Sequence, residues 1–307
     1  MNVIRLFERP HAEALRLVSS GAPVYVFLNP VEFHGPHLPL NTDYLISWNL
    51  AQRLHERIHT ALAAGSEVLV GDVIQLGVDP APGPGSQHTP RRELTRILLR
   101  SLKGLVKLGV QRVVFMTFHG SPGQAAVIEK GIRWLRSQGV PSLNPFNLVL
   151  QQLIEYDPRR FDSVFALISE PRAREKWRAQ MGHDFHGGML ETSFLLDLAP
   201  EHVAPSYQEL PDAPDLRGAP LLRAAAQVAA VLGRQRLSTE LRFASIAVEW
   251  TRLNPHPGYT GAPRWASPEM GALLVEDALR DYARAALATF REGKPSPRAV
   301  MQWAAGY

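Results

Sequence analysis

Short apolar segments alternating with longer amphipathic segments constrain the fold of this 307-residue chain more than any other feature. The short segments are rich in β-forming residues, which is typical of buried strands, and the long ones repeat apolar residues at helical spacing. Strands that alternate with helices predict βαβ units, and therefore an α/β fold with three α/β/α layers around a mostly parallel sheet. The predicted strands are Pro23–Leu28, Glu67–Ile74 and Gln111–Phe118, and the predicted helices are Thr42–Ala64, which Thr42 would cap, Arg92–Leu108 and Gln124–Gln138.

The second half of the chain gives a weaker alternation. Leu143–Leu153 and Ser163–Ile168 are interpreted as further strands, and helices Leu221–Gly233 and Ser267–Phe290 are predicted to flank a strand near Phe243–Trp250. Clusters of Pro, Gly and Asp indicate a loop over Gly77–Pro90 and a surface connection over Leu210–Pro220. Because no segment has the composition of a linker, we expect residues 1–307 to form a single domain.

Composition excludes several classes of function. The 33 basic residues exceed the 29 acidic ones only slightly, and no basic run carries interleaved aromatics, so nucleic-acid binding is not expected. The chain has no cysteine, which excludes disulfides and thiolate metal sites. The N-terminal residues lack the apolar core of a signal peptide, and no apolar run approaches the ~20 residues of a membrane span. We therefore expect a cytoplasmic protein with no membrane association.

The segment Val31–Asp43, with the sequence VEFHGPHLPLNTD, follows the first predicted strand and concentrates polar residues on a constrained loop. Glu32 and His34 stand two residues apart, so an extended backbone projects both to one side. Acidic and imidazole side chains on such a loop are the ligands that a borderline divalent metal requires. A single His or Glu in a loop is more often solvated or satisfied by an ordinary hydrogen bond, and that reading stays open for each residue alone.

Two further clusters contain the same residue types. His119 follows the third predicted strand, within the turn FHGSPG. His186 and Glu191 lie five apart in HDFHGGMLETS, with two glycines between them that permit close approach to a ligand. Each cluster has an ordinary alternative, because a turn often contains His and a Glu in the first turn of a helix often only compensates the helix dipole. Together with the first loop, however, they supply about enough ligands for two metals that share one carboxylate.

In this order the three clusters resemble the creatininase, or creatinine amidohydrolase, family. That family carries E-Q-H-G-P-H-L-P-L-x-T-D, then a strand ending in N-G-H-G-G-N, then H-A-G-x-x-E-T-S; this chain has EFHGPHLPLNTD, TFHGSPG and HGGMLETS. The tail GYTGAPRWASPEMGALLVEDAL is similar to the closing segment of the family. The resemblance spans nearly the whole chain, and its first motif is the most specific.

The resemblance implies a dinuclear metal-dependent hydrolase of a C–N bond in a small amide, cyclic amide or formamide. Two divalent ions, Zn²⁺ or Mn²⁺ and otherwise Fe²⁺, would be held by Glu32, Asp43 and His119 at one site and by His34, Asp43 and Glu191 at the other, with Asp43 bridging. A metal-bridging hydroxide would attack the carbonyl, and His186 would protonate the leaving nitrogen or, alternatively, only support the ligands. The resemblance also implies a small-molecule substrate and a homo-oligomer, a hexamer in relatives.

The chain departs from the family pattern in the turns that would shape the substrate pocket. Phe33 replaces the usual Gln, both asparagines of the His119 turn are lost, and Ser121 stands where creatinine-hydrolysing members place a carboxylate ligand. We therefore do not expect creatinine to be the substrate. The alternative substrates are a formylated pyrimidine and a short peptide precursor. The alternative functions are a catalytically silent metal-binding subunit and a dinuclear phosphoesterase. His37 is expected to organise the loop by a hydrogen bond, and His88 to be an exposed loop residue.

Overall fold

The computed structural model describes residues 2–306, and within them the chain forms a five-stranded sheet in the order β1-β3-β2-β4-β5. Every pair of neighbouring strands is parallel, so the predicted α/β fold is confirmed and the sheet is parallel throughout. The strands are β1 (Val3–Arg5), β2 (Val24–Leu28), β3 (Val68–Ile74), β4 (Val113–Met116) and β5 (Ser142–Leu143). The first of these was not predicted from the sequence, because three residues are too few to show a pattern.

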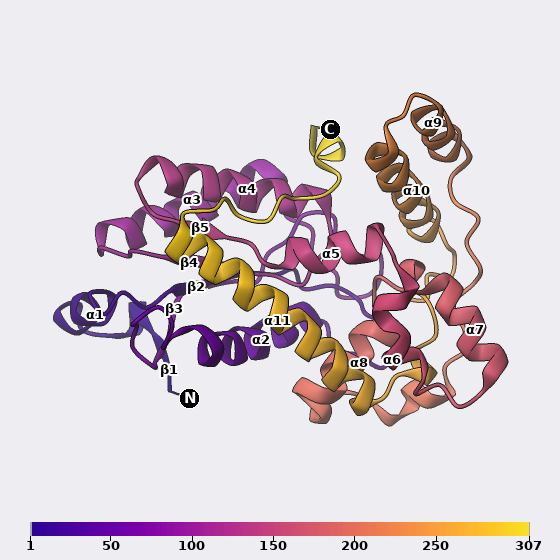
Figure 1. Cartoon of the computed structure of the whole chain (residues 1–307), viewed down its shortest axis with the longest axis horizontal. Helices are drawn as coiled ribbons and strands as arrows, with labels where there is room; N and C mark the ends of the chain where they lie inside the picture. Colours follow the sequence, from indigo (N-terminus) through magenta and orange to yellow (C-terminus); the bar gives the residue numbers. More distant parts are fainter. Residues whose placement is uncertain (1, 307) are drawn as a thin grey trace.

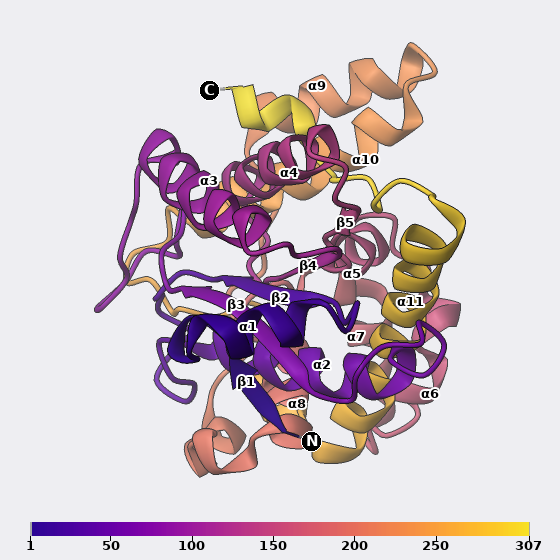
Figure 2. The same ribbon diagram turned by 90° about the vertical axis from the view of Figure 1, so that its left-hand side faces the viewer.

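Helices cover both faces of the sheet, as predicted for three layers (Figures 1 and 2). On one face α3 (Arg91–Lys107) and α4 (Pro122–Ser137) pack against Val24 and Val26 of β2, together with α1 (His11–Val18). On the other face α2 (Thr42–Ile58), α8 (Met189–Leu198) and α11 (Pro268–Glu292) share a core with Tyr25 and Phe27 of the same strand. Side chains of β2 alternate between the two cores, and both of its faces are therefore buried. This explains why the sequence of the strand is a continuous apolar run.

Most helix boundaries agree with those predicted from the sequence, but the C-terminal end of α2 differs. This helix was predicted to reach Ala64 but ends at Ile58, and Ala63 has a φ of 51°, which a continuing α-helix does not allow. The prediction that Thr42 caps the helix was also wrong, because its hydroxyl donates to the Pro39 carbonyl at 2.7 Å instead of accepting from a helix amide. Gly109, with a φ of 88°, ends α3 as expected.

Three predicted strands are helices or mostly helical. Only Ser142–Leu143 joins the sheet; α5 (Phe146–Ile154) begins where the Asn144 side chain accepts from the Phe146 amide at 3.2 Å. The run at 163–168 overlaps α6 (Asp162–Phe165) and continues as a turn. Phe243–Trp250 is the end of α10 (Gln235–Trp250), which packs on α9 (Pro220–Val231). Short apolar runs fit a buried strand and a buried helix equally well, so only the available packing partners decide between them.

The remaining helix, α7 (Pro171–Gln180), lies beside α6 (Figure 1). Residues 210–219 contain neither helix nor strand and lead into α9, as predicted for a connection. Among the helices of residues 2–306, none combines the length and apolarity needed to cross a bilayer.

Candidate metal centre

The predicted site residues meet beyond the carboxyl ends of β2 and β4, which are neighbours in the sheet. Glu32 and His34 lie on the loop after β2, Asp43 begins α2, and His119 follows β4. Ligands of open parallel sheets bind at this edge, because the loops that leave adjacent strands converge there. The sequence could therefore predict the approach of these residues, although they are up to 87 positions apart.

Ligand atoms at this edge form three overlapping groups, of which one joins Glu32 and His34 to His186 and the other two share Asp43. Of the two that share Asp43, one contains Glu32 and His119 and the other contains His34 and Glu191; within each group the atoms lie within 4.8 Å of one another. All five side chains of these two groups are buried. The structure thus brings together every residue that the sequence proposed as a metal ligand, and Asp43 belongs to both groups.

Hydrogen bonds to the backbone fix both histidine rings. Nδ1 of His34 donates to the Glu32 carbonyl at 3.0 Å, and Nε2 of His119 donates to the Val78 carbonyl at 2.9 Å. The other nitrogens then face carboxylates: Nε2 of His34 lies 3.2 Å from Asp43 Oδ1, and Nδ1 of His119 lies 2.8 Å from Glu32 Oε1. Protein ligands to metals typically show this arrangement, in which one ring nitrogen is anchored and the other is left to coordinate.

The carboxylates are anchored in the same way. Glu32 Oε2 accepts from the Ala81 amide at 2.5 Å, and Glu191 Oε2 accepts from the Gly187 amide at 2.6 Å. Oδ2 of Asp43 is buried and has no hydrogen-bond partner within the described part of the chain. A buried carboxylate oxygen without a partner is costly unless a cation binds it, so the donor set and this oxygen both fit a divalent metal.

Burial and mutual charge shift the pKa values of the cluster strongly. Burial raises the pKa of Glu32 and raises that of Glu191 to about 8. Burial alone would lower the pKa of both histidines, but Asp43 and other carboxylates raise that of His34 to about 10, and Glu32 raises that of His119 to about 9. The metal-free cluster therefore retains protons near neutral pH, which a divalent cation would displace.

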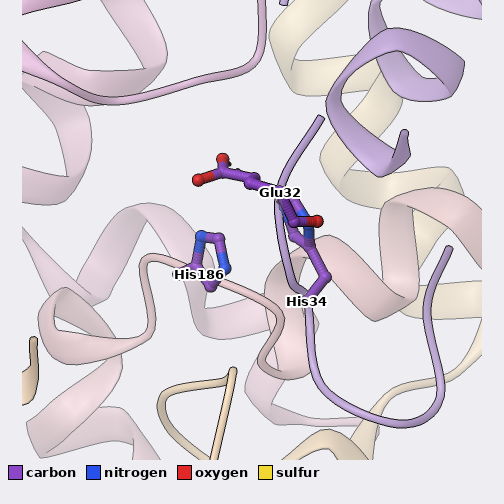
Figure 3. A group of neighbouring side chains, drawn as sticks. All are labelled: Glu32, His34 and His186. Carbon is purple, nitrogen blue, oxygen red and sulfur yellow. Dashed lines mark hydrogen bonds and ion pairs between the residues drawn. The ribbon is translucent and has the colours of Figure 1, made fainter. Parts of the chain in front are cut away.

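His186 reaches the cluster from the loop before α8 (Figure 3). Its ring stacks on His34 with 4.2 Å between centroids, and its Nε2 donates to the Phe33 carbonyl at 2.8 Å. Burial, and then the charge of His34, hold the pKa of His186 well below its usual range. The ring is therefore neutral at pH 7, with its proton on Nε2 and Nδ1 left as an acceptor.

Asp184 organises the loop that carries His186, a role that the sequence left open. Its two carboxylate oxygens accept from the amides of Met189 at 2.8 Å and Leu190 at 3.3 Å, at the start of α8. Gly188 and Gly261 pack so closely on this carboxylate that neither could carry a Cβ. In the sequence the only signal was an Asp just before a His-Gly-Gly motif, and such an Asp could equally be a helix cap or a solvated residue.

Two histidines outside the cluster behave as predicted. Nε2 of His37 lies 2.9 Å from the Thr192 hydroxyl and so ties the first loop to α8. His88 is exposed, although its Nδ1 accepts a 3.3 Å hydrogen bond from the Asp79 amide. Thr192 was not singled out from the sequence, because Thr in an apolar helix is usually only a tolerated neighbour.

Ser121 caps the start of α4. Its hydroxyl oxygen accepts from the Gly123 and Gln124 amides at the start of α4, and its hydroxyl donates to Asp79 Oδ2 at 3.1 Å. Ser121→Ala is expected to lower the free energy of unfolding by about 1 kcal/mol, the usual loss for a helix cap. Chemical denaturation would measure this, with Ser137→Ala at the exposed end of the same helix as the control. Equal stability of the two variants would contradict the capping role.

Comparison with models of protein families matches residues 10–286 to creatininase, described as creatinine amidohydrolase. The chain belongs to the creatininase family. It is 26% identical over 196 residues to the mycofactocin precursor peptide peptidase of Mycobacterium tuberculosis, a match that covers 62% of this chain and 64% of the peptidase. It is 24% identical over 190 residues to the creatinine amidohydrolase of Pseudomonas putida, covering 61% and 68% of the two chains.

Solved structures of creatininases share the fold. One described as "Creatininase Mn" aligns with a TM-score of 0.62 and 20% identity over 94% of this chain and 100% of its own. A mutant creatininase described as "Zn-Zn type" gives a TM-score of 0.61 and 19% identity over 95% and 100%. This creatininase-family chain therefore has the architecture that the motifs implied, while the low identities leave its chemistry to be argued from its own residues.

Proposed function

We propose that this creatininase-family chain hydrolyses a C–N bond in an amide, cyclic amide or formamide, with two divalent metal ions in the cluster. The observation that carries the proposal is that two complete groups of ligand atoms share Asp43. Glu32 and His119 would complete one site, and His34 and Glu191 the other. The Mn and Zn-Zn forms of the structural relatives support these metals as the first candidates. Bound there, two ions would lower the pKa of an attacking water and polarise the substrate carbonyl.

The residues of the chain itself supply orientation and proton transfer. Anchored by Glu32 and Val78 carbonyls, the rings of His34 and His119 cannot rotate away from the carboxylates. His186, neutral and fixed by Phe33, would take the proton of the attacking water at Nδ1. It would return this proton to the nitrogen of the leaving group as the C–N bond breaks. This extends the role first expected for His186, which was that of a proton donor alone.

Elemental analysis of the purified protein tests the proposal directly. We expect about two divalent ions per chain, as in other two-metal hydrolases. Removing them with a chelator should abolish hydrolysis of a panel of simple amides, and Zn²⁺ or Mn²⁺ should restore it. Absence of metal even after reconstitution would refute the dinuclear site. Full metal content with no turnover of any amide would instead favour the catalytically silent subunit.

A peptide precursor is the second candidate substrate. It is favoured by the similarity to the mycofactocin precursor peptide peptidase, although the match covers less than two thirds of that protein. Including short peptides in the amide panel distinguishes it from a small amide. A generic phosphate ester in the same panel tests the dinuclear phosphoesterase, which would require hydrolysis of that ester with none of the amides.

A further inference from the structure

A cavity of about 360 Å³ opens onto the candidate metal centre and is mostly apolar. Glu32, His119 and His186 line one end of it, beside Asp79 and Ser121. Most of the remainder is lined by aromatic and aliphatic side chains from α10, from the loop before α8 and from the C-terminal segment, with Leu150 of α5 and Leu222 of α9. Cavities of this size hold ligands well beyond a small polar molecule, so the apolar part requires an explanation that the metal chemistry does not provide.

Aromatic rings form a continuous wall that begins at the candidate centre. The His186 ring lies 4.9 Å from that of Trp250, and Trp250 lies 5.5 Å from Phe185 in an edge-to-face contact. Phe185 in turn lies 5.2 Å from Phe243 of α10. Trp250 is fixed by its indole N–H, which donates to the Tyr259 carbonyl at 3.0 Å. The wall is thus preorganised, which lowers the entropic cost of placing a ring against it.

The C-terminal segment encloses the cavity from another side. It lies beside α10 in both views of the fold (Figures 1 and 2). Met301 and Trp303 contribute to the lining, and the Trp303 indole donates to Glu240 Oε2 of α10 at 2.9 Å. Ala244 and Ala247 of α10 also line the cavity, and their small side chains leave open the space between α10 and the C-terminal segment. Helix α10 and the C-terminal segment therefore create an apolar chamber adjoining the polar cluster.

The charges that line the cavity restrict what it can accept. Glu32 and the exposed Asp79 are acidic, and no Lys or Arg belongs to its lining among residues 2–306. A carboxylate on the part of the substrate that enters the apolar end would therefore find no cation there, and its desolvation would be unfavourable. A neutral aromatic group, in contrast, would be matched by the edges and faces of Phe185, Phe243 and Trp250.

We propose that the substrate of this site is an amide that carries a neutral aromatic ring on one side of the scissile C–N bond, with the ring held against Phe185, Phe243 and Trp250. The inference rests on the proposed function for the position of the scissile bond, but the ring site itself rests on the cavity alone. It therefore makes a prediction about binding that is separate from any prediction about turnover.

Two matched pairs of amides test the proposal for each side of the bond. Acetamide and phenylacetamide differ by a ring on the acyl side, and N-methylacetamide and N-benzylacetamide differ by a ring on the nitrogen side. Binding is measured through tryptophan fluorescence and calorimetry with the metal-loaded protein. Turnover is measured by release of ammonia from the first pair and of the amine from the second. In at least one pair we expect the amide with the aromatic ring to bind at least about ten-fold more tightly than the amide without it, because apolar pockets discriminate at this level. The same amide should have the higher kcat/KM.

Phe243→Ala should reduce this preference to about two-fold, because it removes the end of the wall farthest from the cluster. Phe7→Ala is the matched control, since Phe7 is exposed and does not line the cavity, and it should retain the preference. No saturable binding of either ring member, no preference in either pair, or a preference that Phe243→Ala leaves intact would each overturn the proposal. Ring binding without turnover of any amide would refute the proposed hydrolysis and support the ring site.

Discussion

Asp43→Ala is expected to remove both metal ions and to lower amide hydrolysis by roughly a thousand-fold or more. Asp43 is the residue common to both groups of ligand atoms, so its loss leaves each group with two protein ligands. Two-metal centres contribute several kcal/mol to the transition state, and every ~1.4 kcal/mol is a ten-fold change in rate. Elemental analysis and the amide assay on the same preparation measure the two losses together.

Matched variants separate this effect from damage to the fold. Asp215→Ala changes an exposed aspartate on the 210–219 connection and should retain full metal content and activity. The double variant Glu32→Ala/Asp43→Ala should have no more metal than Asp43→Ala alone, since the bridging ligand is already absent. If Asp43→Ala retains about two ions or full activity, the bridging role is wrong, whatever the other ligands do.

Asp184→Ala is expected to lower the free energy of unfolding by about 3 kcal/mol, because it leaves buried amides at the start of α8 without an acceptor. The carboxylate also fills the space between Gly188 and Gly261, so the variant creates a small cavity there. Chemical denaturation of the metal-free protein measures the loss, again against Asp215→Ala. A change below about 1 kcal/mol would show that water satisfies these amides.

The pH dependence of stability tests the environment of Asp184 independently. Burial raises its pKa to about 7, above the value near 4 in an unfolded chain. Its contribution is therefore fully present below about pH 4 and is lost as the pH rises through about 7. Relative to Asp184→Asn, which cannot ionise there, the unmodified protein should lose stability over this range. Parallel stability curves for the two proteins between pH 4 and 8 would contradict the raised pKa.

The sequence alone was enough to predict the layers of the fold and which side chains would lie together at the candidate site. The amphipathic segment after Pro90 has the period of a helix, and the short run PVYVFL is rich in β-forming residues, which favours a strand. Because parallel strands end at a common edge, Glu32 and His119 could be expected to meet without knowledge of the intervening chain. The motif EFHGPHLPLNTD made Glu32, His34 and Asp43 candidate ligands through its resemblance to the creatininase family, and the structure places their side chains together.

Tertiary structure decided the features that depend on which partner a segment meets. Phe243–Trp250 belongs to a helix because α10 packs on α9 through Leu237 and Leu241. This packing also sets Phe243 and Trp250 against Phe185, whereas residues 243–250 suit a strand equally well. The same packing, with Trp303 bound to Glu240, creates the apolar cavity beside the cluster, which no local pattern indicates. The free nitrogens of His119 and His186 are likewise set by carbonyls distant in sequence, those of Val78 and Phe33. Period and residue type are local properties of the chain, whereas cavities, ring orientation and buried acceptors arise only from contacts between segments.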